Sequence, residues 1–236
     1  MQAFANYPLF DEVSTSTIQG LMRAATFRCA TEGETLMGAA VDQDQVVFLV
    51  RGSGRAVLPI NDGLEFTPHV YLAPSHFGDL ELLTKNRRTR FTVVALEPCL
   101  VASVPYVAMD GFLASDHSLC LAWLRSAADQ QRAMIDNVKQ SIHGGARARL
   151  VNVFFAFARA FGRPVDDEHV VIERALSYSL LANCAGMSRR GAIKTMAQLQ
   201  EERCIARSEE GWILRQREMR RFLLPDHRGL AMRVTS

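Results

Sequence analysis

Long apolar runs and closely paired cysteines are both missing from this 236-residue chain. No apolar run approaches the ~20 residues of a bilayer-spanning helix, so we expect no membrane segment. The opening residues, MQAFANYPLFDEV, lack a basic region followed by an apolar one, which argues against a signal peptide. The cysteines are odd in number and never spaced as C-x-x-C, which argues against a cysteine-based metal or redox site and favours a reducing cytoplasm. They are Cys29, Cys99, Cys120, Cys184 and Cys204.

Signatures of common enzyme classes are missing as well. The chain contains no G-x-S-x-G, no H-E-x-x-H and no G-x-x-x-x-G-K-[ST]. The glycines of RGSGR (51–55) mark a lone turn, and Asp166-Asp167-Glu168 is most simply a polar loop. We therefore predict no catalytic residue and no metal site.

Acidic residues are absent from GMSRRGAIKTMAQLQ (186–200), which carries Arg189, Arg190 and Lys194 and meets its first acid only at Glu201. The two halves of the chain also differ in charge. Residues 1–144 hold 11 Lys and Arg against 15 Asp and Glu, a net −4, whereas residues 145–236 hold 16 against 10, a net +6. This asymmetry favours a polyanionic partner for the second half.

The first hundred residues begin with a segment of helical sequence pattern and continue with short β-rich runs. Residues 8–30 are predicted to form one or two short helices, with Ser14 or Ser16 as an N-cap. RGSG (51–54) and NDG (61–63) are typical of hairpins, so a barrel or sandwich of short strands is expected up to about residue 105. The β-rich runs are VVFLV (46–50), GRAVLPI (54–60), FTPHVYL (66–72), FTVVAL (91–96) and LVASVP (100–105).

A long helix with a heptad seam should follow. Steps of three and four residues alternate over about three repeats, which favours a homodimer paired along this helix; a helix packed on its own domain is the alternative. The one polar seam residue, Gln131, could fix register, and Gly144-Gly145 should end the helix. The seam consists of Leu121, Leu124, Ala128, Gln131, Ile135, Val138 and Ile142.

The remaining segment has the pattern of a winged helix. An apolar helix (147–161), a turn (162–169) and a short strand (170–173) precede two helices joined at Gly186, where a tight turn is needed. Ser188 should cap the second helix, and CIARS and GWILR should form the wing. A short helix is expected in the tail, REMRRFLLPDHRG. A buried stripe is predicted at Ala192, Met196 and Leu199, which turns Arg189, Arg190 and Lys194 to solvent.

Four local patterns, in this order, resemble the Crp/Fnr family of bacterial transcription regulators over essentially the whole chain. They are PLFDEV, EGETL (32–36), FGDLELLTKNRRTRFTVVAL (77–96) and LANCAGMSRRGAIKTMAQLQEERCI (181–205). The resemblance implies an α+β fold: a β-roll sensor domain (jelly-roll-like, a double-stranded β-helix) in 1–115, a dimerisation helix in 116–144, and a winged helix-turn-helix in 145–236. It implies double-stranded DNA with an inverted-repeat site as partner, with RNA polymerase as a second candidate.

The DNA contacts are expected at the start of the second helix, because residues there reach base edges in the major groove. Arg189 matches the family's near-standard arginine, and arginine can grip guanine O6 and N7. Arg190 stands where many relatives have a glutamate that reads cytosine, which predicts a different operator. Lys194 matches a position that commonly touches base or backbone, and Ser188 could donate to a phosphate.

The effector pocket is harder to assign. In nucleotide-binding relatives a Glu and an Arg-Ser pair hold the ribose and phosphate, and a Thr-Ser pair on the long helix meets the purine. Here these places fall on Asp79, Thr89-Arg90 and Met134-Ile135, so cyclic AMP is not expected. The candidate pocket residues are Gly78, Asp79, Leu80, Arg88, Thr89, Arg90, Met134 and Ile135.

Other sensor chemistries and functions stay open. An iron–sulfur cluster is rejected, because only Cys29 lies in the N-terminal region where the family groups its cysteine ligands. Haem would need one axial ligand, for which His69, His76 and His117 are candidates, and the chain could also have no effector. The alternative function is a ligand-binding regulatory module that does not bind DNA.

Overall fold

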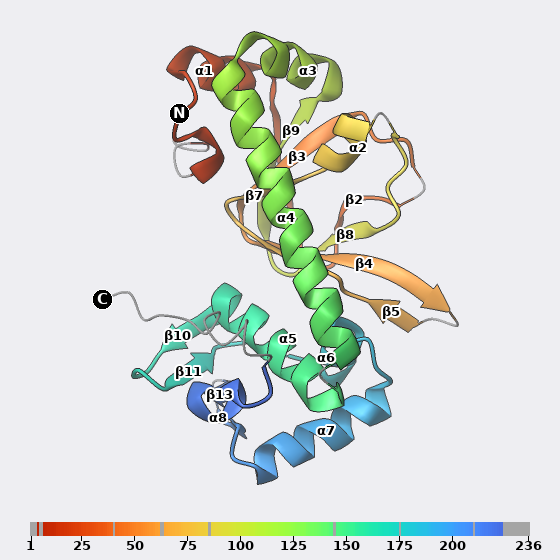
Figure 1. The fold of residues 1–236 in the computed structure, drawn as a ribbon, viewed down its shortest axis with the longest axis vertical. Helices are drawn as coiled ribbons and strands as arrows, with labels where there is room; N and C mark the ends of the chain where they lie inside the picture. Colours follow the sequence, from red (N-terminus) through yellow and green to blue (C-terminus); the bar gives the residue numbers. More distant parts are fainter. Residues whose placement is uncertain are drawn as a thin grey trace. The chain divides into compact units, whose positions relative to one another are not determined.

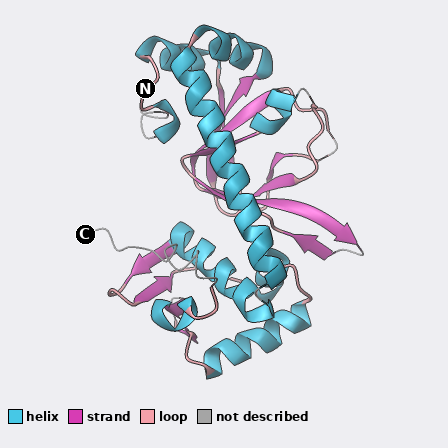
Figure 2. Ribbon diagram, in the orientation of Figure 1, coloured by secondary structure: helices cyan, strands magenta, loops and turns pink. Residues whose placement is uncertain are grey.

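Two compact units make up the chain, shown as a computed structural model in Figures 1 and 2. The first comprises Met1–Leu58 and His69–Met134, and the second Pro59–Pro68 and Ile135–Ser236. The mixture of sheets and helices confirms the α+β class. The structure describes residues 4, 7–39, 41–61, 64–84, 86–143, 145–174, 176–209 and 211–223.

The N-terminal segment is helical only as far as Ala24. A 3-10 turn, η1 (Pro8–Phe10), precedes α1 (Thr15–Ala24), and the Ser14 hydroxyl caps α1 by accepting a hydrogen bond from the Thr17 N–H, 3.2 Å away. The expectation of helix up to residue 30 is wrong beyond this point. Residues Thr26–Ala30 form strand β1, because pairing with a later strand and the β-preference of Thr and Phe prevail there.

Short antiparallel strands build two sheets, with the orders β1-β9-β3-β7 and β2-β8-β4-β5, and β6 pairs with β4. Each of the five runs expected to be β-rich contains a strand. FTPHVYL is divided between two of them, since Pro68 has no N–H to give to a ladder. Their bounds are β2 (Thr35–Met37), β3 (Gln45–Arg51), β4 (Ser53–Asn61), β5 (Leu64–Phe66), β6 (Val70–Leu72), β7 (Ser75–Phe77), β8 (Thr92–Ala95) and β9 (Cys99–Pro105).

Strand β3 serves two hydrophobic clusters at once. Val47 and Leu49 belong to the cluster between the sheets, while Val46 and Phe48 belong to a second cluster with the N-terminal residues and Trp123. Successive side chains of a strand point to opposite faces, so burial on both faces explains the unbroken apolar run VVFLV.

The turn expected at RGSG is present between β3 and β4, but these two strands lie in different sheets and do not pair, so the expectation of a hairpin there is wrong. Gly52 has φ +90°, and a Cβ there would lie 2.7 Å from the Cys99 sulfur, so only glycine fits. The other predicted turn, NDG, lies mostly outside the described residues, which omit positions 62 and 63.

Helices complete the first unit. The short α2 (Asp79–Thr84) follows β7, α3 (Tyr106–Ser115) follows β9, and the long α4 (His117–His143) starts in this unit and ends in the second. Leu119 and Trp123 of α4 are fully buried in the cluster around Phe48. Among the described residues no helix is both long and apolar enough to cross a membrane.

The second unit is a winged helix-turn-helix. After α4 the chain re-enters helix at Gly145, where φ is +61°, while Gly144 lies outside the described residues. A four-stranded sheet has the order β10-β11-β13-β12, and its β12–β13 hairpin confirms the expected wing. The elements are α5 (Gly145–Phe161), β10 (Gly162–Pro164), β11 (His169–Ile172), α6 (Tyr178–Cys184), α7 (Arg189–Glu201), β12 (Ile205–Arg207), β13 (Trp212–Arg215) and α8 (Gln216–Arg220).

Two local expectations in this unit need adjustment. Residues 162–169 were expected to be a turn, but Gly162–Pro164 form β10, because the hydrogen bond from Val165 N to His169 O closes a hairpin onto β11. The tail helix is confirmed as the short α8, and residues 224–229 of the tail lie outside the described part.

Candidate nucleic-acid interface and ligand pocket

The turn between α6 and α7 fixes the start of the candidate recognition helix. Gly186 has φ +58°, and the Ser188 hydroxyl accepts a hydrogen bond from the Gly191 N–H at 3.1 Å. This is an N-cap, as expected from the sequence, and it leaves the Ser188 proton available to a second acceptor.

Helix α7 separates an apolar face from a cationic one. Ala192, Met196 and Leu199 are at most 1% exposed, which confirms the predicted stripe. Ser188, Arg189, Arg190 and Lys194 are all exposed, and within the described residues the three cations form no ion pair. We call these four residues the recognition face. Such a face offers unpaired positive charge and donors over the first two turns of a helix.

The acidic end of α7 is neutralised inside the unit. Glu202, at its C-cap, is paired with Arg147 of α5 and with Arg221, whose Nη2 lies 3.0 Å from Glu202 Oε2. These bonds anchor the helix and remove one negative charge from its surroundings. Sequence reasoning missed them, since the three residues lie far apart along the chain.

The wing adds a further exposed cation. The Arg207 guanidinium lies 5.0 Å from the centre of the Trp212 ring, and Arg207 is otherwise exposed at the end of β12. Stacking on a ring restricts an arginine while leaving its N–H groups free to donate. This residue was not among the predicted contacts, because only the hairpin register brings it to Trp212.

The predicted seam on α4 is an exposed apolar stripe where the structure describes it. Leu121, Leu124 and Ile135 are 39%, 50% and 62% exposed, and Ala128 and Gln131 are also exposed. The opposite face of the helix carries the buried Leu119 and Trp123, so Leu121 and Leu124 lie outside the hydrophobic cluster that these two residues join. The side chains of the remaining two seam residues, Val138 and Ile142, lie outside the described ones.

A cavity of about 230 Å³ lies in the first unit, at part of the segment where the effector pocket was expected. Gly78, Asp79 and Leu80 line it as predicted, with Gly78 at φ +87° and its carbonyl accepting from the Tyr106 hydroxyl at 2.8 Å. The other lining residues, which sequence reasoning missed because they come from distant segments, are His69, Tyr71, Glu81, Phe91, Ala127, Ala128, Gln130 and Gln131.

The predicted pocket residues Arg88, Thr89 and Arg90 are not among those that line the cavity. The Arg88 Nε pairs with Asp42 Oδ1 at 3.2 Å, with both side chains more than 70% exposed, and Arg90 is exposed too. Thr89 between them is buried and donates to the Phe91 carbonyl at 3.4 Å. The buried Thr89 between two exposed arginines shows that successive side chains alternate here between the core and solvent.

Of the two long-helix residues expected in the pocket, Ile135 is not among those that line it. Ile135 belongs to the exposed seam, and the Met134 side chain lies outside the described ones. The helix faces the cavity one turn earlier, through Ala127, Gln130 and Gln131.

Negative charge dominates the cavity. Asp79 and Glu81 are buried to more than 90%, and in the described part of the chain no arginine or lysine lines the space. The pKa of the Tyr71 hydroxyl is raised by burial and, secondarily, by these two carboxylates. A phosphate placed here would be repelled rather than held.

Histidine 76 is a packed core group next to this cavity. Its ring stacks on Trp123 with centroids 4.6 Å apart, and its Nε2 lies 3.3 Å from Gln130 Nε2 and 3.9 Å from Asp79 Oδ2. Burial lowers the pKa of His76, and the nearby Asp79 carboxylate opposes this. The neutral ring is therefore favoured.

Of the three histidines considered as haem ligands, only His69 lines this cavity. A space of about 230 Å³ is below the range of ordinary drug-sized pockets, His76 is enclosed by Trp123, and His117 is exposed at the start of α4. His69 lines the cavity, with its ring 4.6 Å from that of Tyr71. Among the described residues no three His, Cys, Asp or Glu side chains gather as a metal site, and the described cysteines are separate thiols.

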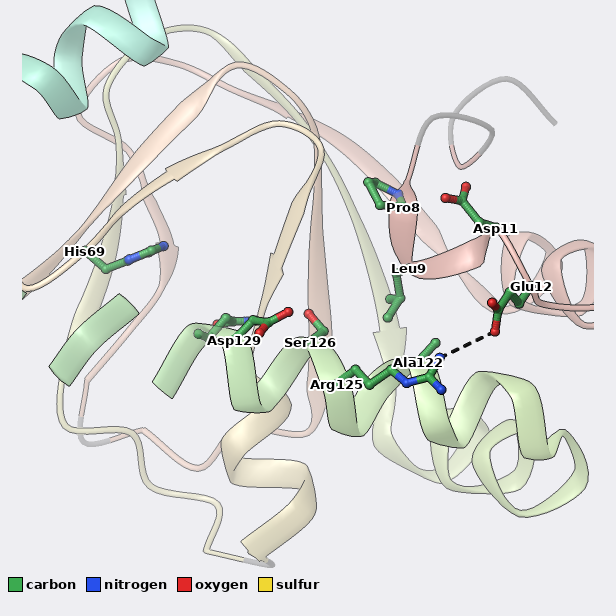
Figure 3. A pocket seen from close by; sticks show the side chains of 10 residues that line it. Pro8, Leu9, Asp11, Glu12, His69, Ala122, Arg125, Ser126 and Asp129 are labelled. Carbon is green, nitrogen blue, oxygen red and sulfur yellow. Dashed lines mark hydrogen bonds and ion pairs between the residues drawn. The ribbon is translucent and has the colours of Figure 1, made fainter. Parts of the chain in front are cut away.

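A second hollow of about 460 Å³ lies between the N-terminal turn and α4 (Figure 3). Asp11, Glu12 and Asp129 line it, and its arginine, Arg125, is paired with Glu12 at 3.5 Å, drawn as the dashed line in Figure 3. This hollow is likewise acidic.

Known proteins resemble the chain over both units. Residues 27–116 match the family described as the cyclic nucleotide-binding domain. The global nitrogen regulator of Synechococcus elongatus is 30% identical over 178 residues, 74% of this chain and 78% of that protein. The global nitrogen regulator of a Nostoc species is 28% identical over 167 residues, 69% of this chain and 73% of that protein.

Solved structures show the same fold at lower identity. The c-di-GMP responsive global regulator CLP of Xanthomonas campestris has a TM-score of 0.71 and 13% identity, covering 86% of this chain and 99% of that one. FixK2 from Bradyrhizobium japonicum has a TM-score of 0.70 and 16% identity, covering 85% and 98%.

Proposed function

Because this chain belongs to the Crp/Fnr family of transcription regulators, whose members bind DNA and act as dimers, we propose that two copies pair along α4 and read DNA with α7. The relatives are regulators and not enzymes, in line with the missing catalytic motifs. In this proposal residues 1–115 are the sensor domain, 116–144 the dimerisation helix and 145–236 the DNA-binding domain. The cytoplasm is the compartment in which such a protein would meet DNA.

The observation that carries the DNA proposal is the recognition face of α7. Arg189, Arg190 and Lys194 lie exposed beyond a capped N-terminus with no acid before Glu201. An arginine that grips guanine in a bidentate fork discriminates by about 1–3 kcal/mol, and phosphate contacts add affinity that falls with salt. Two such helices related by a two-fold axis require half-sites about 10–10.5 base pairs apart, so an inverted repeat is the expected operator.

The test is selection of bound duplexes from a random library by the full chain, followed by fluorescence anisotropy at fixed salt. An enriched inverted repeat bound much more tightly than a scrambled duplex supports the proposal. Equal affinity for all duplexes in dilute salt would contradict it and favour a ligand-binding module without DNA function. RNA polymerase, the second expected partner, is tested by capture on the same operator DNA.

The effector of the first unit, in our proposal, is not a cyclic nucleotide. The cavity has two buried carboxylates and no lining cation in the described part of the chain, so its chemistry suits a neutral or cationic small molecule. Cyclic AMP and cyclic GMP at millimolar concentration should leave the thermal unfolding midpoint unchanged within about 1 °C, since a ligand that does not bind cannot stabilise. A rise of several degrees would overturn this assignment.

A further inference from the structure

One large apolar side chain interrupts the cationic face of α7. Ile193 is 41% exposed. At about 100° per residue, Arg189, Ile193, Arg190 and Lys194 fall at roughly 0°, 40°, 100° and 140° around the helix axis. Ile193 is therefore flanked by cations, and the exposed Ala197 falls beside it at roughly 80°.

Neither helix formation nor the core of the unit accounts for this isoleucine. Isoleucine is a poorer helix former than alanine, leucine or lysine. On the same count the buried stripe of Ala192, Met196 and Leu199 falls at roughly 280–340°, and these three residues supply the packing without Ile193. Single exposed apolar residues are common, so exposure alone argues little. The position argues more, because Ile193 lies between Arg189 and Arg190 on the surface that, in the proposed function, enters the major groove.

The floor of the major groove offers one apolar feature. Base edges there present hydrogen-bond donors and acceptors, and thymine adds its C5-methyl group. We propose that Ile193 is a specificity-determining residue that packs on the C5-methyl of a thymine in each half-site. The inference rests on the proposed function. It adds one thymine in each half-site that is recognised by Ile193 and not by the cations.

The side chain is suited to such a contact. A β-branched residue in a helix holds essentially one χ1 rotamer, so Ile193 loses little freedom when a methyl group packs against it. Burial of one methyl group corresponds to about a fourfold gain in affinity for each half-site. A two-fold site should thus change by roughly fifteenfold when both methyl groups are removed.

Deoxyuridine provides the direct test, because it differs from thymidine only by that methyl group. Each thymine of the selected half-site is replaced in turn, in both half-sites together, and binding is measured by anisotropy at fixed salt. The wild-type chain should lose about fifteenfold at one position and little elsewhere. The Ile193→Ala variant should bind the thymine operator more weakly and show less than about a twofold loss on replacement at that position.

Two further variants act as controls. Ile193→Val keeps branched methyl groups and should retain most of the discrimination. Val165→Ala removes an apolar side chain that is 55% exposed, in the loop before β11, and should leave the deoxyuridine profile as in the wild type. Helical circular dichroism should be unchanged in Ile193→Ala, since alanine favours helix.

The outcomes separate this inference from the function on which it rests. Tight selection of an operator with no sensitivity to deoxyuridine, or with no thymine under α7, overturns the role of Ile193 and leaves DNA binding standing. Equal discrimination by the wild type and by Ile193→Ala also overturns it and points to another side chain. Failure to select any duplex overturns both.

Discussion

The recognition face on α7 and the loop after α2 both carry clustered cations, yet the structure treats them differently. Arg189 and Lys194 are exposed on a capped helix and form no ion pair with any described residue, whereas Arg88 is paired with Asp42 and does not line the cavity. The second unit thus presents positive charge outward, while the first encloses the carboxylates of Asp79 and Glu81.

This difference shows in which kind of segment the sequence alone allows a role to be assigned to an arginine or lysine. On a helix, the 3.6-residue period fixes which side chains share a face once the buried stripe is known. In a loop between a helix and a strand, one residue more or less reverses the direction of every side chain after it. We therefore propose that a polyanion binds the second unit and not the cavity of the first.

The largest effect is expected from a charge placed in the helix seam. Ile135→Asp would bury two carboxylates in each dimer, which should weaken self-association by at least about 100-fold. Sedimentation over a range of concentrations measures this. Val107→Asp, the same kind of change at an 82% exposed position on α3, should leave the dimer intact. A tight dimer of the Ile135→Asp variant would refute the assignment of the seam. It would also refute the use of the helical period to identify which side chains share a functional face.

The next effect separates the two arginine clusters directly. Arg189→Ala should weaken specific operator binding by at least about 30-fold, because each dimer loses two groups worth about 1–3 kcal/mol. Arg88→Ala removes the same charge from an exposed ion pair and should change binding by less than about twofold. Anisotropy at one salt concentration gives both values. Equal losses would mean that net charge alone, and not the recognition face, attracts DNA.

Elements that depend on residues close together in the sequence could be predicted, whereas elements that depend on distant residues could not. The cap at Ser188, the stripe through Met196 and the turn at Gly52 depend on neighbouring residues, and all three are present. The strand at Thr26–Ala30 was missed, because its partner lies some seventy residues later.

The residues of the candidate site also differ in whether the sequence alone could identify them. Gly78 and Asp79 were found from a local motif, but Tyr71, Phe91 and Gln130 reach the cavity only through the tertiary fold. Ile193 was passed over because an apolar residue at helical spacing resembles a core position until its exposure is known.

The stability of the first unit should depend on pH, because His76 lies buried next to the cavity. The folded-state pKa of His76 lies below its unfolded value, so the unfolded chain binds the proton more readily and stability falls as pH drops below about 6.5. The loss should approach at most about 1.4 kcal/mol per pH unit. Urea unfolding followed by Trp123 fluorescence in a Trp212→Phe background measures it. His76→Gln should flatten the slope between pH 6.5 and 5.5, and an unchanged slope would assign the effect to other groups.

The smallest effect compares the two helix caps, Ser188 on α7 and Ser14 on α1. Each hydroxyl accepts one backbone N–H, so alanine at either position should cost about 1 kcal/mol in the unfolding of its own unit. Only Ser188→Ala should also weaken DNA binding, by a few fold, because the cap orients Arg189 and can itself donate to a phosphate. Ser188→Asn, which restores a capping oxygen, should recover the stability. If Ser14→Ala weakens operator binding equally, a general loss of stability, rather than the geometry of the recognition face, explains the Ser188 result.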